Sequence, residues 1–542
     1  MNLDLASKYR ELIIWFFVFC LLVSLPIRFY FLQKNEFEIA LNKSKQSSER
    51  SETLLSRRGK ILDRNFVTLA EDIPAYEIGI EIRSFSFDPF HISSIAKILS
   101  FDSEKLKNKL SDKKREYIVV SHNANQDQLN ALKALKILGL RSIAKYKRSY
   151  PEGKVISQVI GLTDFENNGQ EGIELSINKE LSGINGQKKF IRTNKGKVIE
   201  SQITPPQHGT DVITTLDSKL QYLVYEQLEI ATDFFKASSA SAILVDLKSR
   251  DILVIANYPS FDPNNRRVMN PKLLVNRAAT DLFEPGSTIK PLSLAGLMEE
   301  GIIDDDIKVQ TSPGYIDYKG FVTKDFKNYG LLSLSEIISK SSNVGMVKLC
   351  DKADTDAVVK NLYNWGFGRY MSGIFISTRE GYLPSSKKLS DREKVSLCYG
   401  YGMQVTLIQL VSAYTALFSN GEDKGLNLIS KSFDVFNEKI VSTNTALKIN
   451  KMLSDTVEQG TGRKALVNDI NIVGKTGTTK RLGVNGYTEE SYNASFVGNA
   501  KFDNKDYVIG VLVRDAKENG EGGSQVAAPI FSNILRSIQN TY

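Results

Sequence analysis

An apolar run close to the N-terminus limits what this chain can fold into more than any other feature of the sequence. Leu12 to Leu25 reads LIIWFFVFCLLVSL, and the apolar texture continues to Leu32, which makes 21 residues. As a helix, this stretch measures about 30 Å at roughly 1.5 Å per residue, which is the thickness of the hydrocarbon core of a bilayer. No small-x-small cleavage site follows the run. We therefore predict an uncleaved transmembrane anchor over residues 12–32 rather than a cleaved signal peptide.

The charges around this run predict which way it crosses the membrane. Lys8 and Arg10 precede it, which favours a cytoplasmic tail at residues 1–11, although Arg28 near the far end weakens the asymmetry. Residues 33–542 would then lie outside the cytoplasm.

In the remainder of the chain, the residue pattern changes near Thr204-Pro-Pro-Gln-His-Gly209. This polar segment is rich in Pro and Gly, and we interpret it as a linker. Before it, residues 33–50 are polar and helix-compatible, which predicts a stalk, and residues 51–205 mix strand-like and helical patterns. One apolar helical face runs from Leu129 to Leu138 and stops at Gly139.

After the linker, residues 206–542 have strand patterns at both ends and helical patterns between them. The expected strands are 241–247, 251–256, 470–478, 493–500 and 507–514, and a last helix begins at about residue 527. Strands that come first and last predict an α+β fold, with an antiparallel five-stranded sheet flanked by helices.

Composition excludes several classes of protein. The chain has 542 residues, of which 42% are hydrophobic, and this is enough for two or three domains with real cores. The formal charge of +8 is spread among acidic residues and suits an anionic surface such as a membrane or cell wall. Nothing resembles a nucleic-acid-binding motif, so we expect no nucleic-acid partner.

Histidine and cysteine restrict the chemistry further. The three histidines, His91, His122 and His208, all precede residue 210, so the rest of the chain cannot hold a local Ser-His-Asp triad. No metal-ligand spacing occurs, and we expect neither a metal nor another cofactor. Cys20 lies in the anchor; we expect Cys350 and Cys398 to be buried small hydrophobic side chains rather than a bridge.

Ser287-Thr-Ile-Lys290 is the first candidate for catalysis. The S-x-x-K pattern alone is weak, because it also occurs at Ser94/Lys97, Ser111/Lys114, Ser142/Lys145, Ser176/Lys179 and Ser385/Lys388. At Ser287, however, the preceding Pro285-Gly286 forces a helix to begin there, and Pro291 is tolerated only in a first turn. Ser287 and Lys290 would then share one face at a helix N-terminus, where amide groups favour developing negative charge.

The lysine is the expected base. A serine hydroxyl needs a base, and a neutral lysine one turn away can serve where no histidine is at hand. The pKa of Lys290 must fall from about 10.4 toward roughly 7–8, a cost of ~4 kcal/mol that burial and a neighbouring cation can supply.

Two further motifs follow in order. Ser341-Ser-Asn343 is an S-x-N pattern, common by chance, whereas Lys475-Thr-Gly-Thr478 contains the one KTG of the chain. The KTG ends an alternating strand, and Gly477 would let a substrate backbone approach closely. We expect S-x-x-K, S-x-N and K-T-G, in this order, on a helix, a loop and a strand. Motifs of these kinds are known to act together in catalysis.

These residues resemble the class B penicillin-binding proteins, and the resemblance covers nearly the whole chain. The segments that carry it outside the three motifs are Arg58-Gly-Lys-Ile-Leu-Asp-Arg64-Asn, Arg148-Ser-Tyr-Pro, Gly169-Gln-Glu-Gly172-Ile-Glu174, Thr215-Leu-Asp-Ser-Lys-Leu-Gln221, Pro259-Ser-Phe-Asp-Pro-Asn264 and Tyr399-Gly-Tyr-Gly402. Ser341-Ser-Asn-Val-Gly resembles the division-specific FtsI type, because elongation-specific relatives usually carry Cys-Asp after that serine. Departures such as Leu407-Ile408 for Pro-Leu touch no catalytic position.

The resemblance implies the architecture and location. It implies an elongated α+β pedestal domain of the penicillin-binding protein dimerisation type over residues 33–205. A transpeptidase domain, similar to serine β-lactamases, would occupy residues 206–542. It also implies a single-pass protein of the inner (cytoplasmic) membrane with its catalytic domain in the periplasm, at the division septum. The implied partners are peptidoglycan stem peptides, β-lactams, an FtsW-type glycan polymerase and other division proteins.

The resemblance also implies roles for the motif residues. Ser287 would attack a D-Ala-D-Ala stem peptide, Lys290 would take its proton, Ser341 would pass a proton to the departing D-Ala, and Lys475 would tune the electrostatics. Asn343 would hold the peptide amide. The substrate-binding residues would be Thr476, Gly477 and Thr478.

Other functions are compatible with the same motifs. Water as the acceptor would make a D,D-carboxypeptidase or β-lactamase, although the anchor and the large first domain argue against both. An elongation-specific transpeptidase would share the site. A non-catalytic scaffold of the division machinery is the alternative from a different class, and the intact motifs disfavour it as the sole role.

Overall fold

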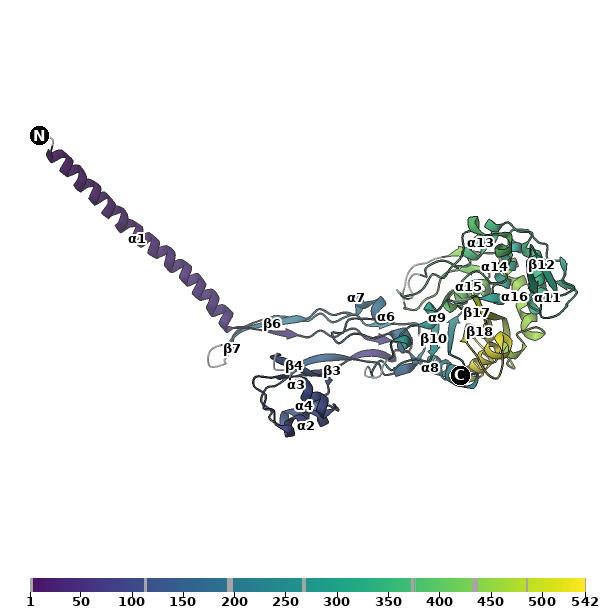
Figure 1. Cartoon of the computed structure of the whole chain (residues 1–542), viewed down its shortest axis with the longest axis horizontal. Coiled ribbons are helices and arrows are strands. Elements are labelled where there is room, and N and C mark those ends of the chain that lie inside the picture. The colour runs from purple at the N-terminus through teal and green to yellow at the C-terminus, as the bar shows by residue number, and fades with distance from the viewer. Residues whose placement is uncertain are drawn as a thin grey trace. The chain divides into compact units, whose positions relative to one another are not determined.

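The structure, a computed structural model, describes residues 3–111, 115–192, 198–265, 270–371, 375, 377–430, 437–483 and 486–541. The chain divides into two compact units. The first comprises residues 1–57 and 183–209, and the second comprises residues 58–182 and 210–542 (Figure 1). The boundary predicted near residue 205 from sequence texture stays a prediction.

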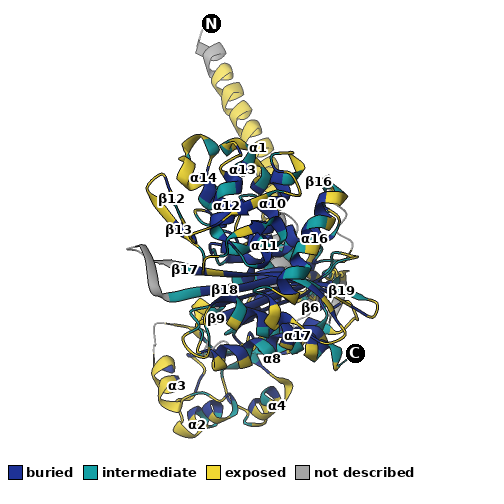
Figure 2. Cartoon of the chain, turned by 90° about the vertical axis from the view of Figure 1, so that its right-hand side faces the viewer, coloured by how far each residue is buried: buried dark blue, intermediate teal, exposed yellow. Residues whose placement is uncertain are grey.

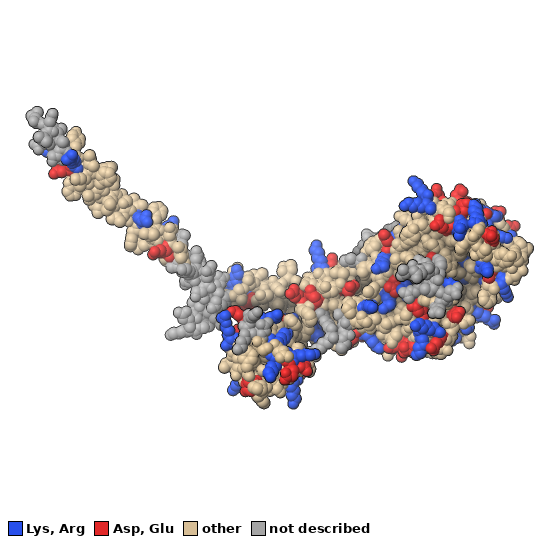
Figure 3. Space-filling model, viewed as in Figure 1, with Lys and Arg blue, Asp and Glu red and all other residues tan. Residues whose placement is uncertain are grey.

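The first unit begins with α1 (Leu3–Ser48), an uninterrupted helix that contains Pro26. Its stretch Lys8–Phe37 has a mean hydropathy of 2.4, and no part of the most apolar window is buried. Trp15 and Phe17 are 71% and 68% exposed, and Figure 3 shows few charged side chains along this helix. So much exposed apolar surface is unfavourable in water but suits lipid. The prediction of one N-terminal apolar helix is confirmed, and the helix extends beyond residues 12–32 at both ends.

The rest of the first unit is an antiparallel sheet. Its strand order is β1–β6–β7, with β1 (Glu49–Leu54), β6 (Gly186–Arg192) and β7 (Val198–Thr204). The side-chain carbonyl of Asn185 accepts hydrogen bonds from the Ser56 backbone N–H (2.8 Å) and hydroxyl (2.9 Å). Segments more than a hundred residues apart in the sequence are thereby joined.

The second unit opens with a smaller α+β part. Its sheet comprises β2 (Ile61–Leu62), β3 (Thr68–Glu81), β4 (Tyr117–Ala124), β5 (Leu140–Ser149) and β8 (Val212–Ile213). The helices of this part are α2 (Pro89–Ile98), α3 (Ser103–Leu110), α4 (Gln126–Ala134), α5 (Ser157–Ile160), α6 (Gly172–Ser176) and α7 (Asn178–Leu181). Long β3 pairs antiparallel with both β4 and β5, while β2 and β8 are parallel. Ile78, Ile95, Leu106 and Leu132 share a core between this sheet and helices α2 to α4.

The predicted helix through Leu138 is wrong at its end. α4 stops at Ala134, Lys136 has a positive φ of 50°, and Leu138 is 74% exposed. Leu129 and Leu132 are buried in the core and Leu135 is partly buried against it, whereas the turn after α4 directs Ile137 rather than Leu138 into the core.

A buried ion network joins three of the sequence motifs. The Glu174 carboxylate accepts hydrogen bonds from Arg58 Nε (2.6 Å) and Arg148 Nε (2.7 Å), and Arg148 also contacts Asp72 (3.3 Å). All four side chains are at most 2% exposed. Burial opposes the charge of Arg148, but the carboxylates of Glu174 and Asp72 outweigh it and raise the pKa of Arg148. Two cations and two anions therefore balance within the fold, and the motifs around Arg58, Arg148 and Glu174 are structural.

The motif at residues 58–65 also contacts the larger part of the second unit, which begins with α8. The buried carboxylate of Asp63 accepts hydrogen bonds from the backbone N–H groups of Asn65 and Val67 through Oδ1. Its Oδ2 accepts from the hydroxyl of Ser218, at the start of α8 (Ser218–Phe234), at 2.8 Å. The first turn of α8 is thus tied to the smaller α+β part.

This larger part contains the antiparallel five-stranded sheet that the sequence predicts. Its strand order is β10–β9–β19–β18–β17, with β9 (Ser239–Asp246), β10 (Ile252–Tyr258), β17 (Asn471–Gly483), β18 (Gly486–Phe502) and β19 (Lys505–Arg514). Alternate residues face two cores: Ile243 and Val245 one, Ala242 and Leu244 the other. The predicted antiparallel sheet built from both ends of this part is confirmed.

Helices cover both faces of this sheet (Figure 2). α8 and α17 (Ala528–Gln539) share a core with one face. The helices on the other side are α9 (Arg277–Thr280), α10 (Lys290–Glu299), α11 (Leu334–Ser339), α12 (Asn343–Cys350), α13 (Thr355–Asn364), α14 (Asp391–Leu397), α15 (Leu407–Phe418) and α16 (Thr443–Glu458). Three two-stranded pairs complete this part: β11 (Lys308–Gln310) with β14 (Leu331–Ser333), β12 (Tyr315–Tyr318) with β13 (Phe321–Lys324), and β15 (Glu422–Asp423) with β16 (Glu438–Lys439).

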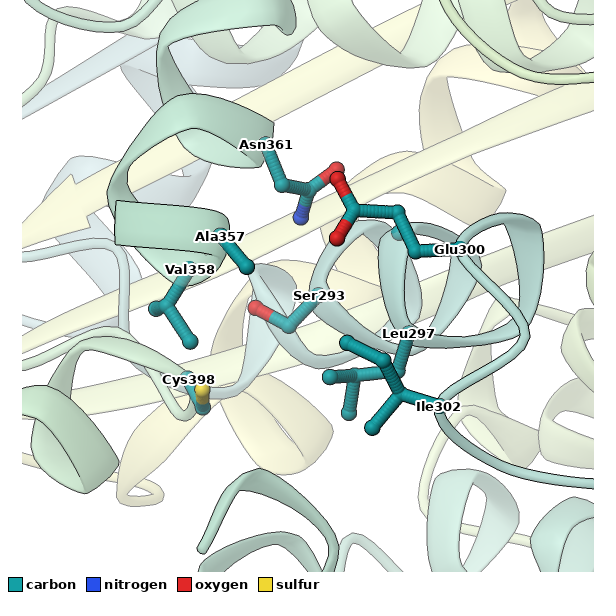
Figure 4. A pocket seen from close by; sticks show the side chains of 9 residues that line it. Ser293, Leu297, Glu300, Ile302, Ala357, Val358, Asn361 and Cys398 are labelled. Atoms are coloured by element: carbon teal, nitrogen blue, oxygen red, sulfur yellow. The ribbon is translucent and has the colours of Figure 1, made fainter. Parts of the chain in front are cut away.

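Cys350 and Cys398 form a disulfide, with their Cα atoms 6.5 Å apart. The expectation that they are buried is confirmed, since both are at most 1% exposed, but the expectation that they do not bridge is wrong. Spacing in the sequence could not reveal the pairing, because the end of α12 and the end of α14 meet only in the folded chain. Figure 4 shows the Cys398 sulfur beside a small pocket of about 10 Å³ whose walls include Ser293, Leu297 and Val358. The disulfide therefore lies against α10, the helix that follows Ser287.

The ion network yields a prediction about stability. Glu174→Ala leaves two buried guanidinium groups without their shared carboxylate, and we expect the free energy of unfolding to fall by about 3–5 kcal/mol. The midpoint of urea unfolding measures this loss. Glu180→Ala removes an exposed carboxylate from the neighbouring helix and should change the free energy by less than about 0.5 kcal/mol. Equal midpoints for wild type and Glu174→Ala would contradict the structural role of the network.

Candidate active site

Ser287 lies on a tight turn directly before a helix. Gly286–Thr288 forms a short 3-10 turn, and α10 begins at Lys290. The predicted helix start at about Ser287 is therefore correct to within a turn. Gly286 has a positive φ of 56°, which glycine adopts without strain, and its N–H donates to the Gly400 carbonyl (3.0 Å).

The turn is held from several sides. Tyr414 donates its hydroxyl proton to the Thr288 carbonyl (2.7 Å), and the Thr479 hydroxyl donates to the Glu284 carbonyl (3.0 Å). Gly400 sits so close to Gly286 that a Cβ added to it would lie 2.1 Å from the Gly286 carbonyl oxygen. Ser287 is half-buried, and its hydroxyl makes no hydrogen bond to any residue in the described part of the chain.

Lys290 connects the helix to the S-x-N segment. Its ammonium nitrogen donates to the Ser341 carbonyl (2.6 Å), to Asn343 Oδ1 (2.7 Å) and to the Ser341 hydroxyl (3.2 Å). Lys290 is completely buried. Burial and the nearby charge of Lys475 lower the pKa of Lys290 well below its ordinary value, although Asp325 opposes the shift.

Lys475 reaches the same hydroxyl from the opposite side. Its nitrogen lies 3.0 Å from Ser341 Oγ, and the side chain is completely buried. Burial lowers the pKa of Lys475 to about 7. Two buried lysines that share one hydroxyl cannot both carry a proton at low cost, so a neutral amine is available near neutral pH.

Ser341 adopts an unusual backbone conformation that serves this arrangement. Its φ is +60°, in the left-handed region that costs a non-glycine residue roughly 1–2 kcal/mol. The residue turns there between α11 and α12, and its carbonyl and hydroxyl oxygens both meet Lys290 Nζ.

The side chains of the KTG segment lie in different surroundings. Thr476 is buried, and its hydroxyl bonds with the Thr461 hydroxyl at 2.8 Å. Thr478 is exposed, and its hydroxyl accepts from the Gly523 N–H (2.9 Å). β17, which carries this segment, is the last strand of the sheet.

Gly477 is required by the packing of the protein itself. A Cβ at this position would lie 2.3 Å from Ser495 Oγ and 3.0 Å from both the Pro285 carbonyl and the Thr288 methyl group. The sequence attributes the lack of a side chain at Gly477 to a close substrate backbone. The structure shows that the turn around Ser287 already requires it.

Asp325 is a residue that sequence reasoning missed. Its carboxylate accepts hydrogen bonds from the Ser342 hydroxyl (2.6 Å) and from the backbone N–H groups of Asn343 (2.6 Å) and Val344 (3.0 Å). It thus caps α12 and orients the S-x-N segment. No sequence signal marks it, because it lies 17 residues before Ser342 and the contact is tertiary.

The structure therefore brings together four of the predicted catalytic residues, Lys290, Ser341, Asn343 and Lys475, through direct hydrogen bonds. Ser287 is placed one turn before Lys290, without a hydrogen bond between the two side chains.

Comparisons with known proteins identify the family. Residues 240–536 match the penicillin binding protein transpeptidase domain, and residues 53–214 match the penicillin-binding protein dimerisation domain. The chain belongs to the penicillin-binding protein family. The transpeptidase match includes Ser287, Ser341 and Lys475.

The relatives place the chain within class B of that family, in its FtsI type. The peptidoglycan D,D-transpeptidase FtsI of Buchnera aphidicola (from Schizaphis graminum) is 31% identical, over 99% of this chain and 97% of the relative. The FtsI of Escherichia coli K12 is 30% identical, over 99% of this chain and 93% of the relative.

A solved penicillin-binding protein has the same fold. Penicillin binding protein 3 from Mycobacterium tuberculosis, solved in complex with aztreonam, has a TM-score of 0.70 at 24% identity and covers 90% of this chain and 97% of its own. The α+β architecture predicted from the sequence is thus confirmed.

The lysine pair predicts how reactivity depends on pH. With Lys290 as the predicted base, reaction with a labelled penicillin should slow as pH falls, because a protonated amine cannot accept the Ser287 proton. The reaction should also slow by about tenfold per pH unit well above about 7, because Lys475 loses its charge. The second-order acylation rate constant, followed from about pH 5 to about pH 10, measures both limbs.

Lys475→Arg is the matched variant for this profile. Arginine keeps its charge over the whole range, so the decline at high pH should disappear even if the maximal rate is lower. An unchanged decline in this variant would show that Lys475 does not cause it.

Proposed function

We propose that this penicillin-binding protein is a peptidoglycan D,D-transpeptidase of cell division that works through an acyl-enzyme on Ser287. The observation that carries the proposal is the pair of buried lysines, Lys290 and Lys475, that meet at the Ser341 hydroxyl beside the nucleophile's turn. The relatives named peptidoglycan D,D-transpeptidase FtsI support the choice of reaction.

The first half of the reaction is acylation. Ser287 Oγ attacks the carbonyl carbon of the penultimate D-Ala, and neutral Lys290 accepts the hydroxyl proton. The backbone N–H groups of Ser287 and Thr478 stabilise the oxyanion, at roughly 3–4 kcal/mol per donor. The peptide C–N bond then breaks, and the Ser341 hydroxyl, which contacts both lysines, passes a proton to the departing D-Ala amine.

Substrate binding uses the remaining motif residues. Lys475, Thr476 and Thr478 hold the terminal carboxylate, and Asn343 holds an amide of the peptide. The position of β17 at the end of the sheet supports this assignment, because an extended peptide can add to a terminal strand through backbone hydrogen bonds.

The second half is aminolysis. An amine from a neighbouring stem peptide attacks the acyl carbon and gives up a proton to the lysine pair. The bond to Ser287 Oγ breaks, and the pair returns a proton to this oxygen, which leaves a cross-link and the free serine. β-Lactams would acylate the same serine; the Mycobacterium tuberculosis protein of the same fold was solved in complex with aztreonam, which supports β-lactam binding.

Orientation and location form a further part of the proposal. α1 spans the inner membrane with residues 1–11 inside, and the catalytic part lies in the periplasm at the septum. The Cys350–Cys398 disulfide supports this orientation, because disulfides persist outside the reducing cytoplasm. An FtsW-type glycan polymerase and other division proteins are the proposed partners.

Labelling with a fluorescent penicillin tests the serine mechanism. Wild-type chain should take up one covalent label, and Ser287→Ala should take up none, because the acyl bond has no oxygen to form on. Ser385→Ala is the control, since it alters an exposed S-x-x-K serine and should label as wild type does. Equal labelling of Ser287→Ala and wild type would disprove the assignment of the nucleophile.

A fusion tests orientation and location together. A fluorescent protein able to fold outside the cytoplasm, attached after residue 542, should be bright and should gather at the division site. The same fusion with a fluorescent protein that folds only in the cytoplasm should be dark. A dark first fusion would contradict the orientation, and an even signal along the side wall would contradict the septal location.

A further inference from the structure

A cleft of about 810 Å³ opens beside the catalytic cluster, and Asn343 lies in its wall. Its other walls come from β13, from the segment that leads from Tyr382 into α14, and from the segment around Tyr401. Phe321 and Tyr382, both of which line the cleft, are 41% and 56% exposed. A concave surface with exposed aromatic walls next to a reactive centre is typical of a ligand subsite.

Asn343 connects this cleft to the chemistry. Its Oδ1 accepts from Lys290 Nζ at 2.7 Å, and its Nδ2 donates to the Lys324 carbonyl at the end of β13 at 3.0 Å. The side-chain amide of Asn343, which we expect to bind the substrate's peptide group, therefore lies at one end of the cleft.

Arg392 supplies a positive charge in the cleft wall. Its guanidinium lies over the Phe321 ring, 5.0 Å from the centroid, and forms no salt bridge with a carboxylate of the described residues. The nearby Glu393 carboxylate is already engaged by the Ser390 N–H (2.9 Å) and hydroxyl (2.7 Å) at the start of α14. A planar guanidinium held against a ring suits a carboxylate of a ligand.

We propose that this cleft binds the donor stem peptide upstream of its D-Ala-D-Ala end, and that Arg392 binds a carboxylate of that acidic peptide segment. The inference rests on the proposed function. There the terminal carboxylate lies at Lys475 and an upstream amide lies at Asn343, so the chain direction leads the rest of the donor from Asn343 into the cleft.

The same reasoning places the donor and acceptor peptides at different sites. The attacking amine must occupy the place that the departing D-Ala leaves, which lies on the Lys475 and Thr478 side of Ser287. The cleft, reached through Asn343, lies on the donor's other side.

Two synthetic peptides that end in D-Ala-D-Ala provide the test with the full-length chain in detergent. They differ in one upstream group, which is a free carboxylate in one and its amide in the other. Arg392→Ala should lower kcat/KM for release of D-Ala from the acidic peptide by about tenfold, mainly through KM, because one charge-assisted contact is lost. The amidated peptide and a labelled benzylpenicillin, whose acyl side chain has no carboxylate, should react within about twofold of wild type.

Two further variants sharpen the comparison. Arg392→Lys keeps the charge without the planar fork and should recover part of the loss. Lys387→Ala removes an exposed cation nearby that does not line the cleft, and it should leave both peptides unaffected.

Each of the remaining outcomes would contradict one specific part of the proposal. Unchanged turnover of the acidic peptide by Arg392→Ala, or an equal fall for both peptides, would refute the carboxylate contact. Normal acylation with weakened transfer to an added amine would assign the cleft to the acceptor instead. Failure of the wild-type chain to react with penicillin would refute the proposed function itself, whatever Arg392 does.

Discussion

The contact on which the site depends is the meeting of two buried lysines at one serine hydroxyl. Lys290 and Lys475 approach Ser341 Oγ at 3.2 and 3.0 Å, and neither ammonium group is exposed to solvent. Burial and mutual repulsion make the doubly protonated state costly, so the pair supplies a neutral amine without a histidine. The nucleophile, the proton carrier and the anion-binding group can then share one small volume.

Holding this pair together requires elements from three distant parts of the chain. Lys290 comes from the start of α10, Ser341 from the turn before α12, and Lys475 from the last strand of the sheet. Asp325 caps α12 through three hydrogen bonds, and the disulfide from Cys350 joins the far end of the same helix to the segment before Gly400. Gly400 in turn touches Gly286, so α12 and the nucleophile's turn are positioned through a continuous set of contacts.

The motifs outside the site have a different task. Arg58, Arg148 and Glu174 lie in separate segments of the sequence, yet they form one charge-balanced cluster with Asp72. Asp63, a few residues after Arg58, binds the start of α8. The cluster therefore holds the smaller α+β part together, and Asp63 ties that part to the first turn of α8.

The sequence by itself determined much of this picture. The length of the apolar run specified a helix long enough to cross a membrane, and strand patterns at the two ends of residues 206–542 specified the antiparallel sheet. Pro285-Gly286 located the start of the helix after Ser287, and the lack of histidine after residue 208 made lysine the expected base. Each of these follows from local periodicity, residue geometry or composition, all of which a linear sequence contains.

Only the tertiary structure decided the rest. It paired Cys350 with Cys398, ended α4 before Leu138, identified Asp325 as the cap of α12 and placed Arg392 in a cleft that begins at Asn343. These features depend on which distant surfaces meet when the core closes. Burial, pairing and the lowered pKa values of the lysines arise from that closure and not from neighbours in the sequence.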